Sequence, residues 1–270
     1  MDRAGVLAPL ADYGRIAALW VRASMAYPAS FWMLAVSSFL MTGLDFVGIW
    51  IIFGVVDDLG GFSLTEIGFL YGATGLGIAF ADLVVGRVER LGQMIRMGRL
   101  DTMMTKPVPL LVQVCADEFA LRRFARVLQS GAVFGWASTY VDWTPARVGV
   151  AVAMVVSGSL IYFSLWISLA CIQFWTADSS EAANAFTYGG NTVMQYPMTV
   201  FPGEVVKALT FVLPIAFVNW YPALYILGRD DPFGMPSWLQ FASPLAAAAS
   251  VLVCALVWRT GVRHYRSTGS

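Results

Sequence analysis

Long apolar runs separated by short polar segments dominate the chain. Residues 23–44, 148–177, 208–228 and 232–258 carry no charged side chain, and shorter uncharged runs cover 67–81 and 127–141. A helix that crosses a bilayer needs roughly 20 mostly apolar residues. The pattern predicts an all-α integral membrane protein with six transmembrane helices, at about residues 30–56, 64–86, 122–141, 147–174, 205–227 and 238–259.

A different pattern precedes the first of these runs. Apolar and small residues recur there at steps of three and four, while Arg15 and Arg22 lie seven apart and share a face. This favours a helix over residues 8–27 that lies in the membrane interface, and a frayed tail is the alternative. The stripe consists of Leu10, Tyr13, Ala17, Trp20 and Ser24. We therefore divide the chain into an N-terminal cytoplasmic or interfacial segment 1–28, a transmembrane domain 29–260 and a cytoplasmic tail 261–270.

Composition agrees with a membrane protein. Hydrophobic residues make up 58% and charged residues 13%, against about 45–50% and about 25% in soluble domains. Of the 17 basic residues, all but Arg147 and Arg229 fall on the side of the six-span arrangement that holds the termini, Lys207 included. Since cytoplasmic loops carry the excess of Lys and Arg, both termini are predicted to be cytoplasmic.

Catalytic chemistry has no basis in the sequence. His264 is the one histidine, and Cys115, Cys171 and Cys254 are far apart, so no catalytic or metal site is expected. The two lysines, Lys106 and Lys207, do not follow glycine, which excludes a P-loop. We expect no cofactor in this chain and no nucleic-acid partner. If ATP is used, another chain must bind it.

Three residues are candidates for contact with a transported molecule. Asp45 lies near the middle of the first predicted span, where a charge is costly and is a functional candidate. It would contact substrate or a proton, or would be a structural acid bonded to a neighbouring helix. Met194 and Tyr196 are candidates for contact with an apolar substrate, with lipid or core contact as the alternative. Asp82 and Glu66 are expected near the two ends of the second span.

Small residues and prolines indicate where helices approach or bend. Gly68 and Gly72 are four residues apart in the second predicted span, a spacing that lets helices pack closely. Such packing serves a moving subunit interface or ordinary contact within the chain. Pro214 lies inside the fifth predicted span and is expected to kink it, either as a hinge or as a fixed structural bend.

The segment "GRLDTMMTKPVPLLVQV", residues 98–114, interrupts the apolar pattern. Its apolar residues Leu100, Met103 and Met104 recur in a stripe that Val108 and Leu111 continue, and Asp101, Thr105 and Lys106 lie off it. Pro107 ends the regular helix. The pattern predicts a short amphipathic helix on the cytoplasmic side that docks a soluble partner. The alternative is a basic loop that only follows the positive-inside rule.

That segment, together with "SGSLIYFSLWISLACIQFW", "GGNTVMQYPMTVFPGEVVKALTFVLPIAFVNWYPALYILGRDDP" and the tail "WRTGVRHYRSTGS", resembles ABC transporter permeases of the ABC-2 exporter class. The similarity is greatest to the bacterial branch with two different permease subunits and a separate ATPase. The resemblance implies that the protein lies in the bacterial inner membrane. It also implies that the transport path is embedded in the lipid bilayer and shared with a second permease subunit, which is either non-identical or a second copy of this chain. Two ATPase subunits would bind ATP and Mg²⁺.

The resemblance also assigns the loop between the second and third spans to a coupling helix that contacts the ATPase. On this chain it falls on Leu100, Asp101, Met103, Met104, Lys106 and Pro107. The substrate is left open by the resemblance. An ion-coupled secondary transporter is the alternative function, but it calls for ion sites and often inverted repeats, and the sequence offers only Asp45 and no repeat. A membrane enzyme would need a cluster of acids, bases or metal ligands, which the sequence lacks.

Overall fold

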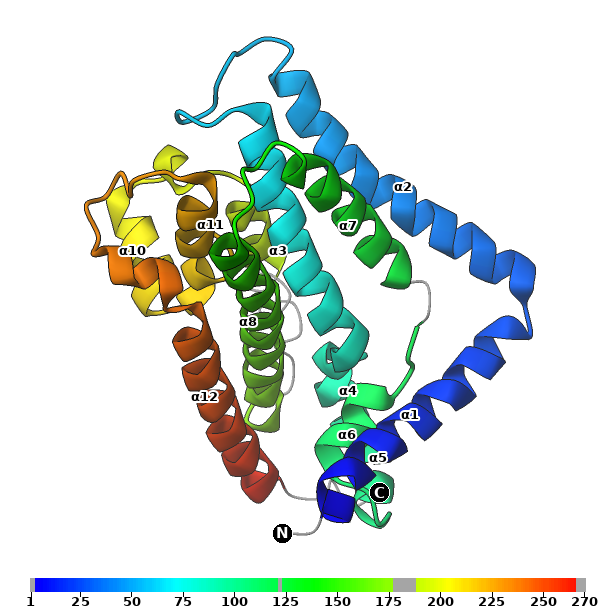
Figure 1. Ribbon diagram of the computed structural model, residues 1–270. Coiled ribbons are helices and arrows are strands. Elements are labelled where there is room, and N and C mark those ends of the chain that lie inside the picture. Colours follow the sequence, from blue (N-terminus) through cyan, green and yellow to red (C-terminus); the bar gives the residue numbers. More distant parts are fainter. Residues whose placement is uncertain (1–2, 121–122, 177–187, 266–270) are drawn as a thin grey trace.

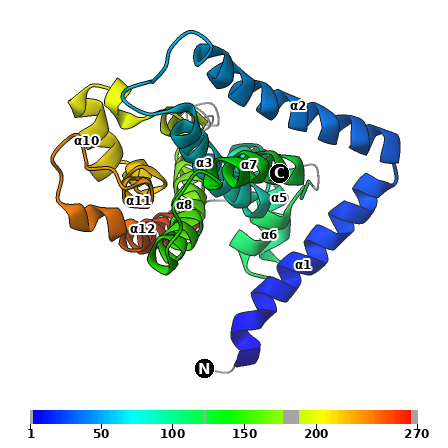
Figure 2. The ribbon, with the colours of Figure 1, turned by 45° about the horizontal axis from the view of Figure 1, so that its top comes forward.

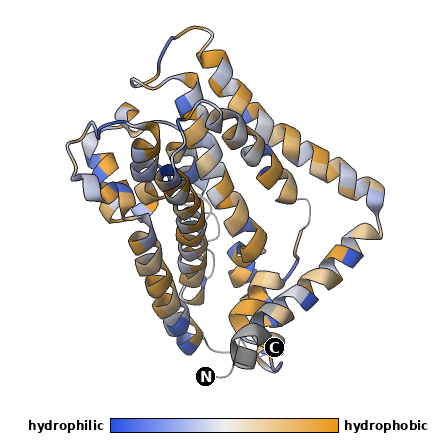
Figure 3. Ribbon diagram, in the orientation of Figure 1, coloured by the Kyte–Doolittle hydropathy of each residue, from blue (hydrophilic) through white to orange (hydrophobic). Residues whose placement is uncertain are grey.

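The structure is a computed structural model, and it describes residues 3–120, 123–176 and 188–265 (Figure 1). Within these residues, four helices are long and apolar enough to span a membrane. They are α2 (Pro28–Ile52), α3 (Leu64–Val85), α8 (Pro145–Ala170, continued by η3, Cys171–Phe174) and α12 (Ser243–His264). Apolar residues predominate along these helices (Figure 3), and many large apolar side chains of α2, α8 and α12 are exposed. The chain is therefore an all-α integral membrane protein, as predicted.

Helix α3 forms the centre of a helical bundle. It begins with a capping box in which the Ser63 side chain accepts from the backbone of Glu66 and the Glu66 side chain accepts from the backbone of Ser63. Helix α7 (Phe124–Ser138) and helix α8 pack on α3, and α12 packs on the far side of α8 (Figures 1 and 2). With 15 residues, α7 is about 22 Å long, so the predicted third span 122–141 is shorter in the structure.

Helices α1 (Arg3–Met25) and α2 form an elbow that stands away from the bundle (Figures 1 and 2). Pro28 starts α2, because its missing N–H is tolerated at a helix start. The α1 face with Tyr13, Ala17, Trp20 and Ser24 is buried or half-buried, and Arg15 and Arg22 are exposed. The Leu10 side chain lies outside the described residues. The Tyr13 hydroxyl donates to the carbonyl oxygen of Leu83 at 3.0 Å and ties α1 to α3.

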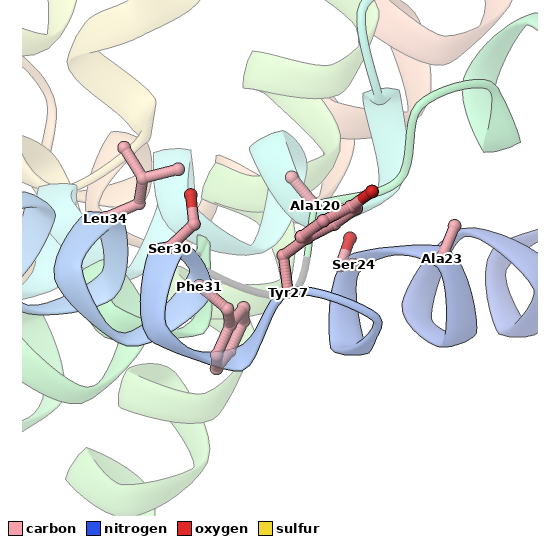
Figure 4. A pocket seen from close by; sticks show the side chains of 7 residues that line it. All are labelled: Ala23, Ser24, Tyr27, Ser30, Phe31, Leu34 and Ala120. Carbon is pink, nitrogen blue, oxygen red and sulfur yellow. The ribbon is translucent and has the colours of Figure 1, made fainter.

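A pocket of about 190 Å³ lies at this elbow. Side chains from the end of α1 and the start of α2 surround it, and Ala120 closes it from the segment before α7 (Figure 4). The α1 and α2 residues are Ala23, Ser24, Tyr27, Ser30, Phe31 and Leu34. The elbow therefore leaves space between the N-terminal helix and the bundle.

The two ends of the molecule differ in charge. One end, here called the basic end, holds the short helices η1 (Val88–Arg90), α4 (Leu91–Arg96), α5 (Arg99–Met104) and α6 (Leu110–Ala116), and the C-terminus of α12 (Figure 1). The opposite acidic end holds the loops 53–63, 139–144 and 228–236. These loops carry Asp57, Asp58, Asp142, Asp230 and Asp231.

The predicted single span at 205–227 is wrong. The chain there forms α10 (Gly203–Phe211), then η5 (Pro214–Phe217) and α11 (Trp220–Leu227), and these two parts meet at an angle of 74°. Before α10, the Thr199 hydroxyl donates to the carbonyl oxygen of Gly60 at 2.8 Å. After α11, Arg229 binds Glu66, its Nε lying 2.7 Å from Oε1. Both ends therefore lie at the acidic end, and the segment is a re-entrant pair.

The crossing is made earlier in the chain instead. Trp175 stacks on His264 at the basic end, with ring centroids 5.5 Å apart, while Thr199 lies at the acidic end. Tyr188 lies beside Arg126 in the first turn of α7, so the described residues 188–199 run toward the acidic end. Residues 177–187 lie outside the described residues. Lys207, counted with the cytoplasmic basic residues, lies in the re-entrant pair. Hydropathy could not show that the segment 205–227 turns back, because it measures how long an apolar run is and not whether the run crosses the membrane.

The last predicted span, 238–259, is shifted along the chain. Residues Ser237–Phe241 form a 3-10 helix, η6, and the long helix α12 begins only at Ser243. Pro244 at its first turn and the Ser243 hydroxyl, which donates to the carbonyl oxygen of Phe217 at 2.7 Å, fix this start. The start of α12 is therefore anchored to the re-entrant pair.

Candidate functional site

The predicted amphipathic element has its own fold at the basic end. Gly98 adopts a left-handed conformation with φ 67° and turns the chain into α5, which ends at Met104. Leu100 is fully buried and Met103 is 8% exposed. The face directed outward comprises Thr102, Met104, Thr105, Lys106 and Pro107, and we call it the coupling face after the role that the sequence predicts for it. Of the predicted coupling residues, Leu100 and Met103 therefore hold the helix in place, and only the others are accessible.

Three side chains fix this element to helix α6. Arg99 binds the carboxylate of Asp117 through Nη2, at 3.1 and 2.9 Å from its two oxygens. The buried amide of Gln113 donates to the carbonyl oxygens of Met103 and Val108, each at 2.8 Å. Burial raises the pKa of Asp117, and the charge of Arg99 opposes that rise. The turn that carries Lys106 and Pro107 is thus held from within.

Two further contacts connect the basic end to the long helices. The Tyr265 hydroxyl, directly after α12, donates to Oδ1 of Asp101 at 2.9 Å. At the end of α8, the Gln173 Oε1 accepts from the backbone N–H of Gly92 at 2.6 Å, and its Nε2 donates to the carbonyl oxygen of Glu89 at 2.9 Å. These hydrogen bonds attach α5 to the end of α12, and η1 and α4 to the end of α8.

An arginine closes the basic end of α3. Gly86 has φ 62°, and a side chain there would collide with the carbonyl oxygen of Cys115. The Arg123 guanidinium donates to the carbonyl oxygens of Asp82 and Gly86, at 2.6 and 2.7 Å. Asp82 also lies 3.3 Å from Arg123 and 3.6 Å from Arg126. Asp82 therefore lies near the end of its span, as expected, and is compensated by two arginines.

Two adjoining cavities run along α2, between that helix, α3, α7 and residues 188–196. The cavity nearer the basic end has a volume of about 500 Å³ and the other about 270 Å³, and they share Thr42, Arg126 and Tyr188. The first is lined by charged side chains: Asp82, Arg87, Glu89, Arg90, Arg123 and Arg126. The second, here called the upper cavity, is lined mainly by neutral polar and tyrosine side chains. Together they make a polar passage beside an apolar helix.

The three predicted path residues are distributed unequally around this passage. Asp45 and Tyr196 both line the upper cavity. Asp45 lies seven residues before the end of α2, so it is on the acidic-end side of the middle of the helix. Met194 is 1% exposed and its carbonyl oxygen accepts from Thr74 at 3.1 Å and Asn219 at 2.7 Å. Met194 therefore packs in the core and is not among the residues that line the cavity.

The predicted packing and hinge residues lie where helices meet. A Cβ atom at Gly68 would be 2.8 Å from the ring of Trp136, and one at Gly72 would be 2.6 Å from the backbone of Phe134. Both glycines thus bring α7 against α3 within this chain. Pro214 begins η5, at the 74° bend of the re-entrant pair.

Several residues that build this site were missed by the sequence analysis. Gln113, Gln173 and Asn219 are buried and bond the backbone of distant elements. Asn219 donates to the carbonyl oxygens of Leu70 and Met194 at the bend before α11. Each amide lies in or beside an apolar run, and this could have identified it, because a buried amide must find hydrogen-bond partners.

Comparison with known proteins identifies the family. A family model described as "ABC-2 family transporter protein" matches residues 39–269. No curated protein and no solved structure matches the chain. The match covers α3 to α12, including the basic end, the passage and the re-entrant pair. The chain therefore belongs to the ABC-2 transporter family and is a membrane-embedded permease component of an ABC transporter.

Proposed function

We propose that this chain is the permease subunit of an ATP-driven exporter in a bacterial inner membrane. Its basic end and both termini face the cytoplasm, and it shares the transport path with a second, non-identical permease subunit. Two ATPase subunits bind ATP and Mg²⁺ and drive the movement. The family match, the missing P-loop lysine and the basic residues gathered at one end support this assignment.

The coupling face is the observation that carries the proposal. It presents an apolar side chain, Met104, beside a positive one, Lys106, on a helix whose other side is buried. Exposed methionines suit docking surfaces because the side chain is flexible and polarisable. Because Leu100 and Met103 are buried, a partner could push on α5 without unfolding it.

The contacts at the basic end would transmit a movement of α5 to the long helices. Pressure on α5 would pass through Asp101 and Tyr265 to α12, and through the backbone of α4 and Gln173 to α8. The Arg99–Asp117 pair keeps α5 and α6 together during the movement. ATP-driven closure of the ATPases would in this way tilt the spans that border the polar passage and change its access.

The proposal is tested by Met104→Asp in the complex with its ATPase. Met104 is 41% exposed, and so is Met25 at the end of α1, which makes Met25→Asp a matched control outside the coupling face. We expect Met104→Asp to reduce co-purification of the ATPase and substrate-stimulated ATP turnover by about tenfold, the effect of a typical interface anchor. The control should retain both. Met103→Asp is unsuited, because a buried charge at Met103 would disturb folding.

Unchanged assembly and turnover in Met104→Asp would contradict the docking role of the coupling face. Transport that continues in vesicles with ATP depleted and a proton gradient intact would contradict the ATP-driven mechanism itself. The first measurement tests where the ATPase binds, and the second tests whether ATP drives transport.

A further inference from the structure

Helix α2 has two different faces in the half that begins at the elbow. One face turns the hydroxyl side chains of Ser37, Ser38 and Thr42 to the larger of the two cavities, of about 500 Å³, here called the charged cavity. A neighbouring face of the same turns lines an apolar groove of about 330 Å³ between α2 and α7, whose side chains include Trp32 and Leu128. Helix α2 therefore borders a polar space and an apolar space at the same level.

The pocket at the elbow adjoins both spaces. It shares Leu34 with the charged cavity and Phe31 with the apolar groove (Figure 4). Helix α2 stands away from the bundle here, so the three spaces follow one another around its first turns (Figure 2). A molecule with a charged head and apolar chains matches this arrangement.

Arginines outnumber acids in the wall of the charged cavity. Its charged side chains are those of Arg87, Arg90, Arg123, Arg126, Asp82 and Glu89. Asp82 is shared by two of the arginines, since it lies 3.3 Å from Arg123 and 3.6 Å from Arg126. Burial raises the pKa of Glu89, in η1, and so weakens its negative charge. The head of a molecule in this cavity would therefore meet more positive than negative charge.

The four arginines are not equally available. Arg87 binds Glu118 at 2.7 Å, and Arg126 also lines the upper cavity, where Asp45 is its neighbour. Arg90 lies at the end of η1, is exposed and forms no ion pair within the described residues. Arg90 is therefore the arginine that is free to bind a ligand in the charged cavity.

We propose that the charged cavity and the apolar groove together hold one anionic phospholipid from the leaflet at the basic end. Its phosphate lies against Arg90 and the hydroxyls of Ser37 and Ser38, because guanidinium and hydroxyl groups donate to phosphate oxygens. Its acyl chains lie in the groove between α2 and α7. Basic pockets between spanning helices bind lipid headgroups in this way. The inference goes beyond the proposed function, because it concerns the lipid that surrounds the permease.

The test uses the purified full-length chain in detergent and three probes. Phosphatidylglycerol carries phosphate and acyl chains, diacylglycerol has the same chains without phosphate, and glycerol phosphate has phosphate without chains. Native mass spectrometry measures how much of each probe is bound as its concentration is raised. We expect phosphatidylglycerol to bind and the other two probes to bind far more weakly, because each lacks one half of the contacts.

Three variants locate the site. Arg90→Gln should weaken the binding of phosphatidylglycerol by about fivefold, the effect of one basic residue on an anionic lipid. Arg259→Gln removes an exposed arginine from α12, outside the cavity, and should leave binding unchanged. Ala35→Phe places a ring in the apolar groove and should weaken binding without a change of charge. It therefore tests the site even where Arg90→Gln fails to fold.

The inference is overturned if the wild type does not bind phosphatidylglycerol, or if diacylglycerol or glycerol phosphate binds as tightly. It is also overturned if either Arg90→Gln or Ala35→Phe folds and binds like the wild type. An equal loss in Arg259→Gln and Arg90→Gln would show a general attraction of lipid to basic residues and no site. Because the experiment contains no ATPase, its outcome is independent of the Met104→Asp result.

Discussion

Helices α2 and α3 have nearly the same mean hydropathy, 1.7 and 1.6, but opposite surroundings. Only 11% of the apolar window of α2 is buried within the chain, against 89% for α3. Helix α3 is enclosed by α7 and α8, while α2 contacts the bundle along a narrow line and borders the polar passage (Figure 2). Hydropathy therefore identifies a span but cannot say whether lipid or protein surrounds it.

Glycine positions explain part of this difference. In α3, side chains at Gly68 and Gly72 would strike α7, so the missing side chains permit the close approach. In α2, a Cβ at Gly43 or Gly48 would meet nothing within 4 Å. The same residue type therefore creates an interface in one helix and none in the other. The contrast leads to three predictions.

The largest effect is expected from truncating one phenylalanine in each helix. Phe69 in α3 is fully buried, with its ring centre 4.9 Å from that of Phe134, and Phe39 in α2 is 44% exposed. Phe69→Ala should lower the free energy of unfolding by about 3–5 kcal/mol, and Phe39→Ala by less than about 0.5 kcal/mol. Thermal melting of the purified chain in detergent measures both. Equal losses would show that α2 packs against this chain as α3 does.

A smaller effect is expected from adding one methyl group. In Gly72→Ala the new Cβ would lie 2.6 Å from backbone atoms of Phe134, which cannot rotate away. The variant should destabilise the chain by about 1–3 kcal/mol. Gly43→Ala should be neutral or stabilising by up to about 1 kcal/mol, because alanine favours a helix and the space is open. A stable Gly72→Ala protein would mean that α3 and α7 are further apart.

The smallest effect concerns the bond that joins the two helices. Tyr71 in α3 donates to the carbonyl oxygen of Thr42 in α2 at 2.9 Å. Tyr71→Phe removes this bond and the longer one that the hydroxyl accepts from the buried Gln129 amide at 3.3 Å, and it should cost about 1–2 kcal/mol. Amide hydrogen exchange should become faster in α2 around Thr42 and stay unchanged in α3. Tyr140→Phe, at an exposed tyrosine in the acidic-end loop, is the control. Unchanged exchange in α2 would show that contacts other than the Tyr71–Thr42 bond hold α2 to the bundle.

Much of the fold could be predicted from sequence. The spans at α2, α3 and α8 begin and end within about four residues of the predicted limits. Charged residues, glycine or proline interrupt the apolar run at the ends of each span, so its length can be read from the sequence. The span at 205–227 could not be predicted, because its direction depends on the contact of Thr199 with the loop before α3 and that of Arg229 with Glu66 in the first turn of α3. Periodicity put Met104 on the same stripe as Leu100 and Met103 and could not show that Met104 alone of the three is exposed.

The site divides in the same way. Asp45 and the 98–114 segment were visible because a charge or a basic, proline-ended segment stands out in apolar sequence. Gln113, Gln173 and Asn219 were not assigned, because a buried amide acquires its role only from the backbone groups it meets.

By itself, the sequence determined that this protein is helical and lies in a membrane, and that it carries no P-loop. These properties depend on local composition and on the absence of a lysine after glycine. Only the tertiary structure decided that the 203–227 segment turns back, that Met104 is accessible while Met103 is not, and that Asp45 faces a cavity. Those outcomes depend on which distant backbone groups and side chains meet, because buried polar groups must find partners and packed helices must exclude voids.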